Sequence, residues 1–214
     1  MCASIGNSVF ITLEGPDGSG KTTQFHRLSE WLRGRGCDVL ALREPGGTAI
    51  GEAVREVLLQ YRGDVSMDAR AELLLFCASR AQLIAERIEP HLRAGGVVLC
   101  DRFADSTLAY QGYGRGLDLA VLRSLLAFAT REISPDLTLY FDVAPEIGLQ
   151  RRAQGGGVNR LDAESLDFHR RVRQGYVELM AADATRWVRI DGAARIDDVT
   201  QATLACVTER MGPK

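Results

Sequence analysis

Eight consecutive residues near the start of the chain have the types and spacing that bind a nucleotide phosphate. The segment Gly15-Pro16-Asp17-Gly18-Ser19-Gly20-Lys21-Thr22 fits the pattern G-x-x-x-x-G-K-[ST]. Its glycines allow a tight turn whose N–H groups point inward, and the N-terminus of a following helix adds positive charge. We expect Lys21 to reach the β- and γ-phosphates and the Thr22 hydroxyl to ligate Mg²⁺.

The use of lysine supports this interpretation over a glycine turn that binds no ligand. The chain has only two lysines, Lys21 and Lys214, and every other basic residue is arginine. A compact, mobile ammonium differs in function from a guanidinium fork at few positions, and a phosphate-binding loop is one of them. The internal lysine stands at that position.

The elements around this loop predict an α/β fold. Apolar or β-branched runs predict five strands, at residues 9–13, 37–42, 97–100, 137–143 and 187–191. Helical spacing predicts helices after the loop to about 33, around 50–58, and over 67–92, 119–129, 145 onward, 166–180 and 199–207. Strands that alternate with helices indicate a parallel sheet with helices on both faces, in a single domain over residues 1–214.

The predicted strand ends gather charged residues. In an open parallel sheet, ligands bind beyond the carboxyl ends of the strands. Those ends carry the phosphate loop with Asp17, then Arg43 and Glu44, then Asp101 and Arg102. Cations, carboxylates and phosphate-binding backbone together suit phosphoryl transfer. We predict Asp101 as a second metal ligand beside Thr22, although an aspartate there is also common as a turn residue or cap.

Other candidate residues have both structural and functional interpretations. Phe76 lies on an apolar helical face and suits a core position, yet Arg80 shares that face at i+4 and needs a partner. The segment from Asp101 to Gly116 is polar, and we assign it no helix or strand. The histidines have neither metal-ligand spacing nor a triad partner, so we expect them to be structural; they are His26, His91 and His169.

Composition excludes several classes of protein. A net charge of −2 over 214 residues gives no field that would recruit nucleic acid or an anionic membrane. No apolar run approaches the ~20 residues of a membrane span, and the first residues lack the features of an export signal. Five scattered cysteines without a CxxC pair indicate reduced thiols, so we expect a cytoplasmic protein.

Four segments together resemble thymidylate kinases, over about residues 9–207. They are Leu13-Glu14-Gly15-Pro16-Asp17-Gly18-Ser19-Gly20-Lys21-Thr22-Thr23-Gln24, Arg43-Glu44-Pro45-Gly46-Gly47-Thr48, Leu75-Phe76-Cys77-Ala78-Ser79-Arg80-Ala81-Gln82, and Asp101-Arg102-Phe103 with Ser106-Thr107-Leu108-Ala109-Tyr110-Gln111-Gly112. The first is common to phosphate-loop enzymes, and the other three are specific to this family. The resemblance implies the fold of P-loop nucleoside monophosphate kinases.

The resemblance also implies an activity and a set of roles. The activity is transfer of the ATP γ-phosphate to dTMP with Mg²⁺, by a homodimer. Phe76 would stack on thymine, and Arg80 would bond a base carbonyl. Thr107 and Gln111 would lie at the base edge, and Tyr110 would pack against the deoxyribose. Asp17 would lie near the acceptor's sugar and phosphate, and Arg43 and Arg102 would hold that phosphate.

In this family, a basic residue near the transferring phosphate comes from the phosphate loop or from a lid. This loop has no arginine, and its lysine is the motif's own, so the resemblance implies a lid arginine from a segment at about 150–162. The candidates are Arg151, Arg152 and Arg160, and the Gly155-Gly156-Gly157 run would let the lid close. Asn159 stands where the family usually has aspartate, and the choice among the arginines stays open.

Two other classes of function compete with this one. Another nucleoside or nucleotide kinase of the same fold would share the loop and the sheet. A nucleotide-switch module or GTPase would need an N-K-x-D signature, which a chain without lysine between Lys21 and Lys214 does not contain.

Overall fold

The sheet is the centre of the molecule. The computed structural model describes residues 8–61, 66–154 and 159–212. Five parallel strands lie in the order β2-β3-β1-β4-β5. They are β1 (Val9–Glu14), β2 (Val39–Arg43), β3 (Val97–Asp101), β4 (Leu137–Asp142) and β5 (Trp187–Asp191). The predicted five-stranded parallel sheet is confirmed, with small shifts at strand ends.

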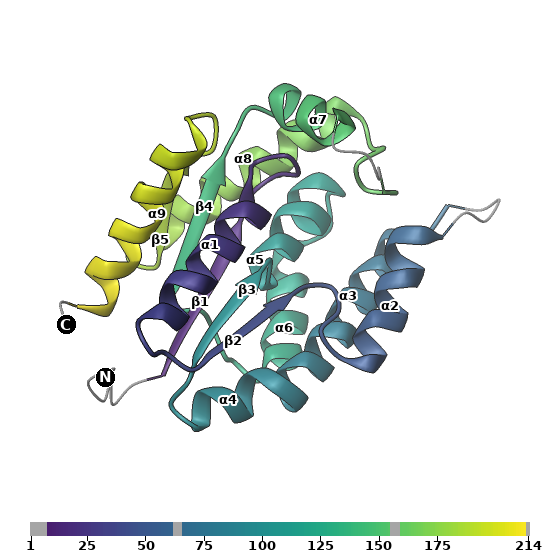
Figure 1. Ribbon diagram of the computed structural model, residues 1–214. Helices are drawn as coiled ribbons and strands as arrows, with labels where there is room; N and C mark the ends of the chain where they lie inside the picture. The colour runs from purple at the N-terminus through teal and green to yellow at the C-terminus, as the bar shows by residue number, and fades with distance from the viewer. Residues whose placement is uncertain (1–7, 62–65, 155–158, 213–214) are drawn as a thin grey trace.

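Helices cover both faces of this sheet (Figure 1). They are α1 (Lys21–Gly34), α2 (Ala49–Gln60), α3 (Ala69–Leu83), α4 (Glu89–Arg93), α5 (Ala104–Thr107), α6 (Leu119–Thr130), α7 (Pro145–Gln154), α8 (Leu166–Ala182) and α9 (Ile196–Met211), with π-helical segments η1 (Ile84–Ile88) and η2 (Leu108–Gly114). None of these described helices has both the length and the apolar character needed to span a bilayer.

The core explains why the central strands have unbroken apolar sequences. A strand covered on both faces buries its odd and even side chains alike. Leu13 and Leu99 pack with Leu28 of α1 on one face. On the other face, Val98 packs with Ile84 of η1. All five strands run in the same direction, so their carboxyl ends open at one edge of the sheet.

The predicted helix over 67–92 is one helical run with a change of winding. It begins at α3, widens to a π-helix in η1 and continues as α4. Pro90 in α4 lacks an N–H donor, and its ring would crowd the carbonyl of residue 86 in a regular α-helix. The wider turn lies just before it. From its helical spacing we predict Leu74 on the apolar side of this run, but the structure leaves its side chain 55% exposed.

The polar segment after β3 is helical, which its sequence did not predict. α5 and η2 form one run from Ala104 to Gly114. The segment is polar because one face lines a cavity at the strand ends, with Thr107, Tyr110 and Gln111 at i, i+3 and i+4. A π-helix often marks a functional site.

Candidate active site

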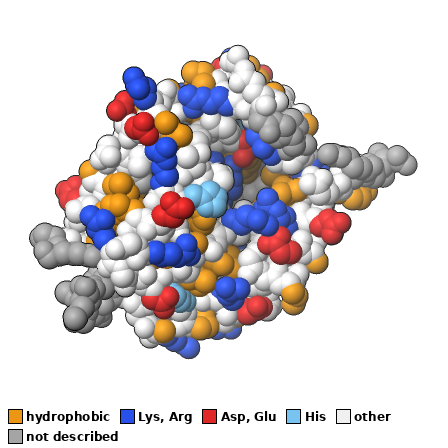
Figure 2. All heavy atoms as spheres, in the orientation of Figure 1, with side chains coloured by type: hydrophobic (Ala, Val, Ile, Leu, Met, Phe, Trp, Pro, Cys, Tyr) orange, Lys and Arg blue, Asp and Glu red, His pale blue; other side chains and the backbone are white. Residues whose placement is uncertain are grey.

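One cavity of about 550 Å³ lies at the carboxyl ends of β1, β2 and β3. Arg43 and Leu13 both align with Asp101, which brings the three strand ends together. Figure 2 shows this hollowed face with basic side chains gathered around it. The predicted residues that line the cavity are Asp17, Gly18, Ser19, Gly20, Lys21, Thr22, Arg43, Phe76, Arg80, Asp101, Arg102, Thr107, Tyr110, Gln111, Arg151 and Arg152. Gly15 and Pro16 belong to the same loop, whereas Arg160 lies elsewhere.

The phosphate loop requires glycine at two close approaches. Gly15 has a φ of 141°, and a Cβ there would lie 2.5 Å from the Phe141 carbonyl oxygen. Gly18 has a φ of 75°, and a Cβ there would collide with the Gly148 backbone of α7. Gly20 caps α1 without a side-chain hydrogen bond. The first N–H groups of α1 therefore have no capping side chain and suit an anion.

Lys21 is folded back onto this loop. Its Nζ donates to the carbonyl oxygens of Gly15 and Pro16, each at 2.8 Å, and to Ser19 Oγ at 3.3 Å. Burial, with the nearby charge of Arg102, lowers the pKa of Lys21 to about 8. A bound phosphate would replace these hydrogen bonds and favour the charged ammonium.

The predicted metal ligands are neighbours. Thr22 Oγ1 lies 3.4 Å from Asp101 Oδ2 and donates to it. The other carboxylate oxygen, Asp101 Oδ1, is buried and has no hydrogen-bond partner in the described chain. A hydroxyl and an unpartnered carboxylate oxygen fit Mg²⁺, which takes oxygen ligands and completes its shell with substrate phosphates and water.

Arg102 has an unusual backbone conformation, and its side chain belongs to a network of partly buried polar groups. Its φ is 68°, in the left-handed region that few non-glycine residues adopt. Nη2 donates to Asp17 Oδ1 at 2.9 Å and to the Tyr110 hydroxyl at 3.2 Å. The Tyr110 hydroxyl donates to Asp17 Oδ2 at 3.1 Å. Burial opposes ionisation of Asp17, but the charges of Arg102 and Lys21 hold its pKa below the usual value.

Glu14 supports this network from below, and sequence reasoning missed it. It is fully buried at the end of β1. Its Oε2 accepts from the Ser106 and Tyr176 hydroxyls at 2.6 and 2.9 Å, and its Oε1 accepts from the Phe103 N–H at 2.8 Å. Burial, with the charge of Asp105, raises the pKa of Glu14 to about 7. The sequence did contain a signal for this role, because Glu14 is a charged residue at the end of an otherwise apolar strand.

Arg80 is a buried cation with one free donor. Its side chain is 1% exposed, and its Nε and Nη2 contact Glu44 Oε2 at 2.8 and 2.6 Å. Nη1 donates to Thr107 Oγ1, and Nη2 donates to the Phe103 carbonyl oxygen, each at 3.1 Å. A guanidinium has five N–H groups. Four of these bond to described residues, so within the described chain one hydrogen on Nη1 is left for a ligand in the cavity that Arg80 lines.

Phe76 lies one turn before Arg80 on α3 and lines the same cavity. Its side chain is 9% exposed, and it is not paired with any other described aromatic ring. Phe76 therefore combines both interpretations, because it packs in the core below and offers a ring to the cavity above.

The rim of the cavity near β2 has a second arginine that sequence reasoning missed. Arg43 pairs with Glu52 of α2 at 2.9 Å. Arg55, one turn further along α2, lines the cavity and donates to the Pro45 carbonyl oxygen at 2.8 Å. The signal was its place in the first two turns of the helix that follows a charged strand end.

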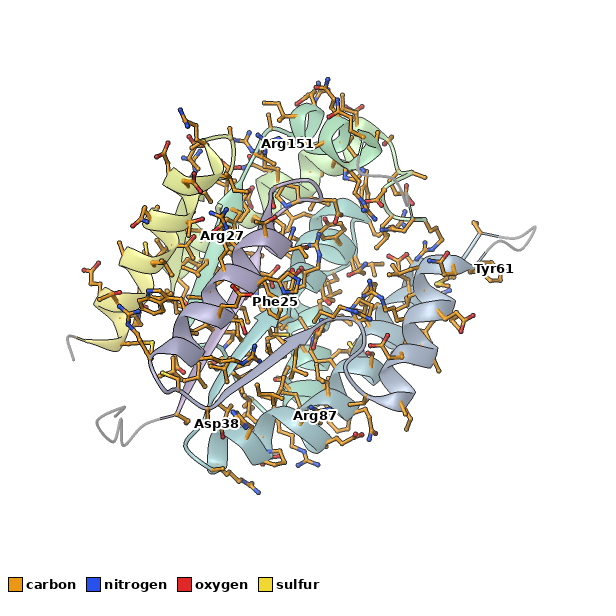
Figure 3. The ribbon with its side chains drawn as sticks, in the orientation of Figure 1. Phe25, Arg27, Asp38, Tyr61, Arg87 and Arg151 are labelled. Atoms are coloured by element: carbon orange, nitrogen blue, oxygen red, sulfur yellow. The ribbon has the colours of Figure 1, made fainter. Side chains whose placement is uncertain are left out.

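The three candidate lid arginines are bonded to different partners. Arg151 of α7 (Figure 3) lines the cavity and donates to the Gly192 carbonyl oxygen at 2.8 Å. Arg152 also lines the cavity and pairs with Asp162 at 3.0 Å. Arg160 pairs with Glu72 of α3 at 2.5 Å and donates to the Leu58 carbonyl oxygen. The predicted glycine hinge, residues 155–157, lies outside the described residues.

The chain is similar to known proteins over nearly its whole length. The family model described as "Thymidylate kinase" matches residues 13–203. A thymidylate kinase of Roseiflexus sp. is 47% identical over 212 residues, with 94% of this chain and 93% of that protein covered. One of Geobacillus thermodenitrificans is 48% identical over 207 residues, covering 96% and 92%.

A solved structure extends the likeness to the fold. The thymidylate kinase of Ehrlichia chaffeensis superposes with a TM-score of 0.75 at 35% identity, covering 94% of this chain and 99% of that one. A family match over most of the chain, together with relatives near half identity over nearly their whole lengths, places the protein: it belongs to the thymidylate kinase family.

Proposed function

We propose that this protein transfers the γ-phosphate of ATP to dTMP, giving ADP and dTDP. A phosphate oxygen of dTMP forms a bond to the γ-phosphorus, and the bond from that phosphorus to the β–γ bridging oxygen breaks. One observation carries the proposal. A single cavity joins the phosphate loop to a buried arginine with one free donor, so donor and acceptor sites meet.

On the donor side, the loop N–H groups and Lys21 hold the ATP phosphates. The ammonium exchanges its bonds to Gly15 and Pro16 for the β- and γ-phosphate oxygens. Thr22 and Asp101 would hold Mg²⁺ beside the ATP phosphates, and an ion bound there would supply positive charge to the phosphate oxygens. The unpartnered Asp101 Oδ1 supports this assignment.

On the acceptor side, Arg102 and Arg43 hold the phosphate of dTMP, and the placement of Arg55 supports a third contact. Asp17 fixes Arg102 from behind through a 2.9 Å ion pair, so the guanidinium meets the phosphate without reorienting.

The base and the sugar are held by groups on α3, α5 and η2. Phe76 stacks on thymine, while the free Nη1 hydrogen of Arg80 bonds a base carbonyl. Thr107 and Gln111 lie at the base edge. Tyr110 packs against the deoxyribose, and its hydroxyl is fixed by Asp17 and Arg102, which leaves little room for a 2′-hydroxyl.

A lid over about 150–162 supplies the basic residue for the transferring phosphate. Arg151 and Arg152 already line the cavity, whereas Arg160 must first leave Glu72. Positive charge at that phosphate stabilises the transition state. Single substitutions of the three arginines identify the one that acts.

The protein acts as a homodimer through α3 and α6. These two helices pack against each other and expose Leu74, Val121 and Phe128, which are 55%, 55% and 86% exposed. Exposed large apolar side chains on adjoining helices support a protein interface. Sedimentation should give twice the monomer mass, and Phe128→Asp should halve it. A monomeric wild-type protein would refute the assignment.

We place this enzyme in the cytoplasm. Among the described residues, Cys77, Cys100 and Cys206 form no disulfide, which suits a reducing compartment. Cell fractionation tests the placement, since recovery in a membrane or exported fraction would contradict it.

A panel of acceptors tests the proposed reaction. dTMP, dUMP, UMP and thymidine are each offered with ATP and Mg²⁺, and ADP is measured. We expect dTMP to have the highest kcat/KM, with UMP disfavoured by its 2′-hydroxyl. A different best acceptor would identify another kinase of this fold and refute the assignment.

A further inference from the structure

Glu72 of α3 is a carboxylate that is completely buried beside the base end of the cavity, with 0% exposure. Its Oε1 accepts a hydrogen bond from Gln111 Nε2 at 2.7 Å. Its Oε2 accepts from Arg115 at 3.2 Å and from Arg160 at 2.5 Å. A buried carboxylate is unfavourable unless it is paired, and here the two guanidinium groups stabilise it.

The charge of Glu72 decides how the amide of Gln111 is turned. Burial would raise the pKa of Glu72, but the hydrogen bonds from Arg115 and Gln111 outweigh burial and hold that pKa below its usual value. An ionised carboxylate only accepts hydrogen bonds. Gln111 must therefore turn its NH₂ group toward Glu72, and this contact fixes which end of the amide is nitrogen and which is oxygen.

The other end of the Gln111 amide is left for a ligand. Gln111 lines the cavity, and no residue of the described chain donates to its Oε1. We propose that Glu72 is a positioning residue, which holds the Gln111 oxygen toward the base and so selects bases that carry a proton on N3. This inference rests on the proposed function, because it assumes a pyrimidine acceptor in this cavity.

The selection follows from matching donors with acceptors. Thymine and uracil have a donor at N3 and a carbonyl at C4, which suit the Gln111 oxygen and the free Arg80 hydrogen. Cytosine has an acceptor at N3 and an amino group at C4, so both contacts are mismatched. Turning the Gln111 amide over would restore a hydrogen bond to N3 of cytosine. The Gln111 oxygen would then lie at the 2.7 Å contact with Glu72 Oε1, where two acceptors repel each other.

The variant Glu72→Gln tests the proposal, because a neutral amide in place of Glu72 can pair with either orientation of Gln111. kcat/KM is measured for dTMP, dUMP and dCMP. We expect the dTMP:dCMP ratio to fall about tenfold or more. The dTMP:dUMP ratio should not change, because both bases carry the N3 proton. Damage to the fold, or to Arg160, would lower all three values together and leave both ratios intact.

Glu164→Gln is the matched control. Glu164 also pairs with Arg115, at 2.6 Å, but it makes no hydrogen bond to Gln111 in the described chain. Its ratios should equal those of the wild type. A dTMP:dCMP ratio within twofold of wild type in Glu72→Gln, or an equal fall in the control, would overturn the inference. A wild-type protein that does not phosphorylate dTMP would instead refute the proposed function itself.

A measurement on the wild-type protein decides the matter if Glu72→Gln does not fold. The side-chain amide protons of Gln111 are identified by NMR from their loss in Gln111→Met. They should exchange slowly with solvent, because Gln111 is 1% exposed and bonded to Glu72. Exchange at the rate of an exposed glutamine would overturn the proposal.

Discussion

The acceptor side and the lid side of the cavity hold their arginines in different ways. On the acceptor side, Arg80 is buried against Glu44, Arg102 is half-buried against Asp17, and both arginines line the cavity. On the lid side, Arg160 is bonded away from the cavity, to Glu72 and the Leu58 carbonyl oxygen. Arginines on the acceptor side are therefore held in place facing the cavity. On the lid side, Arg160 is instead bonded to partners outside the cavity.

The difference teaches how the site divides its work. Groups held by buried ion pairs lose little freedom when a ligand arrives, so the acceptor side is organised in advance. If Arg160 is the lid arginine, as we propose, it must first exchange partners and contributes only once the substrates are bound. Substitutions on the two sides should therefore separate acceptor binding from turnover.

Breaking the buried pair on the acceptor side should have the largest effect. Arg80→Met leaves Glu44 buried without its cation, so we expect a loss of about 3–5 kcal/mol in the free energy of unfolding. Adding Glu44→Gln should recover most of that loss. Urea unfolding of the single and double variants measures both values. Equal stability of Arg80→Met and wild type would show that the pair does not organise this side.

Lys21→Ala removes charge from the transferring phosphate. We expect kcat to fall about 10²–10³-fold, with the fold intact by circular dichroism. Steady-state rates with saturating ATP and dTMP measure the effect. Near-normal turnover by a folded variant is incompatible with the assignment of this loop.

Arg160→Ala sharpens the comparison on the lid side. We expect kcat to fall about tenfold or more while the KM for dTMP stays within twofold, because charge at the transferring phosphate acts in the transition state. Arg151→Ala and Arg152→Ala are the matched variants. If Arg160→Ala turns over normally and one of them does not, the role passes to that residue.

The pH dependence of nucleotide binding gives the smallest expected effect. In the free protein, burial lowers the pKa of Lys21 to about 8, so part of the ammonium is neutral at pH 8.5. ATP phosphates favour the charged form, so binding raises that pKa and takes up a proton. ATP affinity should therefore weaken as pH rises above 8, by at most about tenfold per unit. Calorimetry at pH 8.5 in two buffers with different ionisation enthalpies measures the proton uptake on ATP binding. Zero proton uptake would count against the lowered pKa of Lys21.

The sequence was sufficient where local pattern decides structure. The phosphate loop between a strand and a helix and the apolar runs of the sheet have local signals, and they predicted the fold and most of the cavity lining. The sequence was not sufficient to predict contacts between residues that are far apart along the chain. Arg160 and Glu72 are 88 residues apart, and no periodicity joins them.

The helical run formed by α5 and η2 was not predicted from the sequence, for a related reason. Its buried face meets a polar cavity rather than an apolar core, so Thr107 and Gln111 are buried where a hydrophobic stripe would normally stand. Leu74 shows the reverse error, because an apolar residue at helical spacing proved to be exposed. Both departures fall at surfaces that we assign to binding.

Titration of the nucleotide-free protein with dTMP by calorimetry tests the central claim most directly. An acceptor site that is organised in advance should bind dTMP without ATP, one per chain, with the same affinity in Arg160→Ala and a loss of affinity in Arg80→Met. Absence of dTMP binding until ATP is added, or equal weakening by both substitutions, would contradict this account.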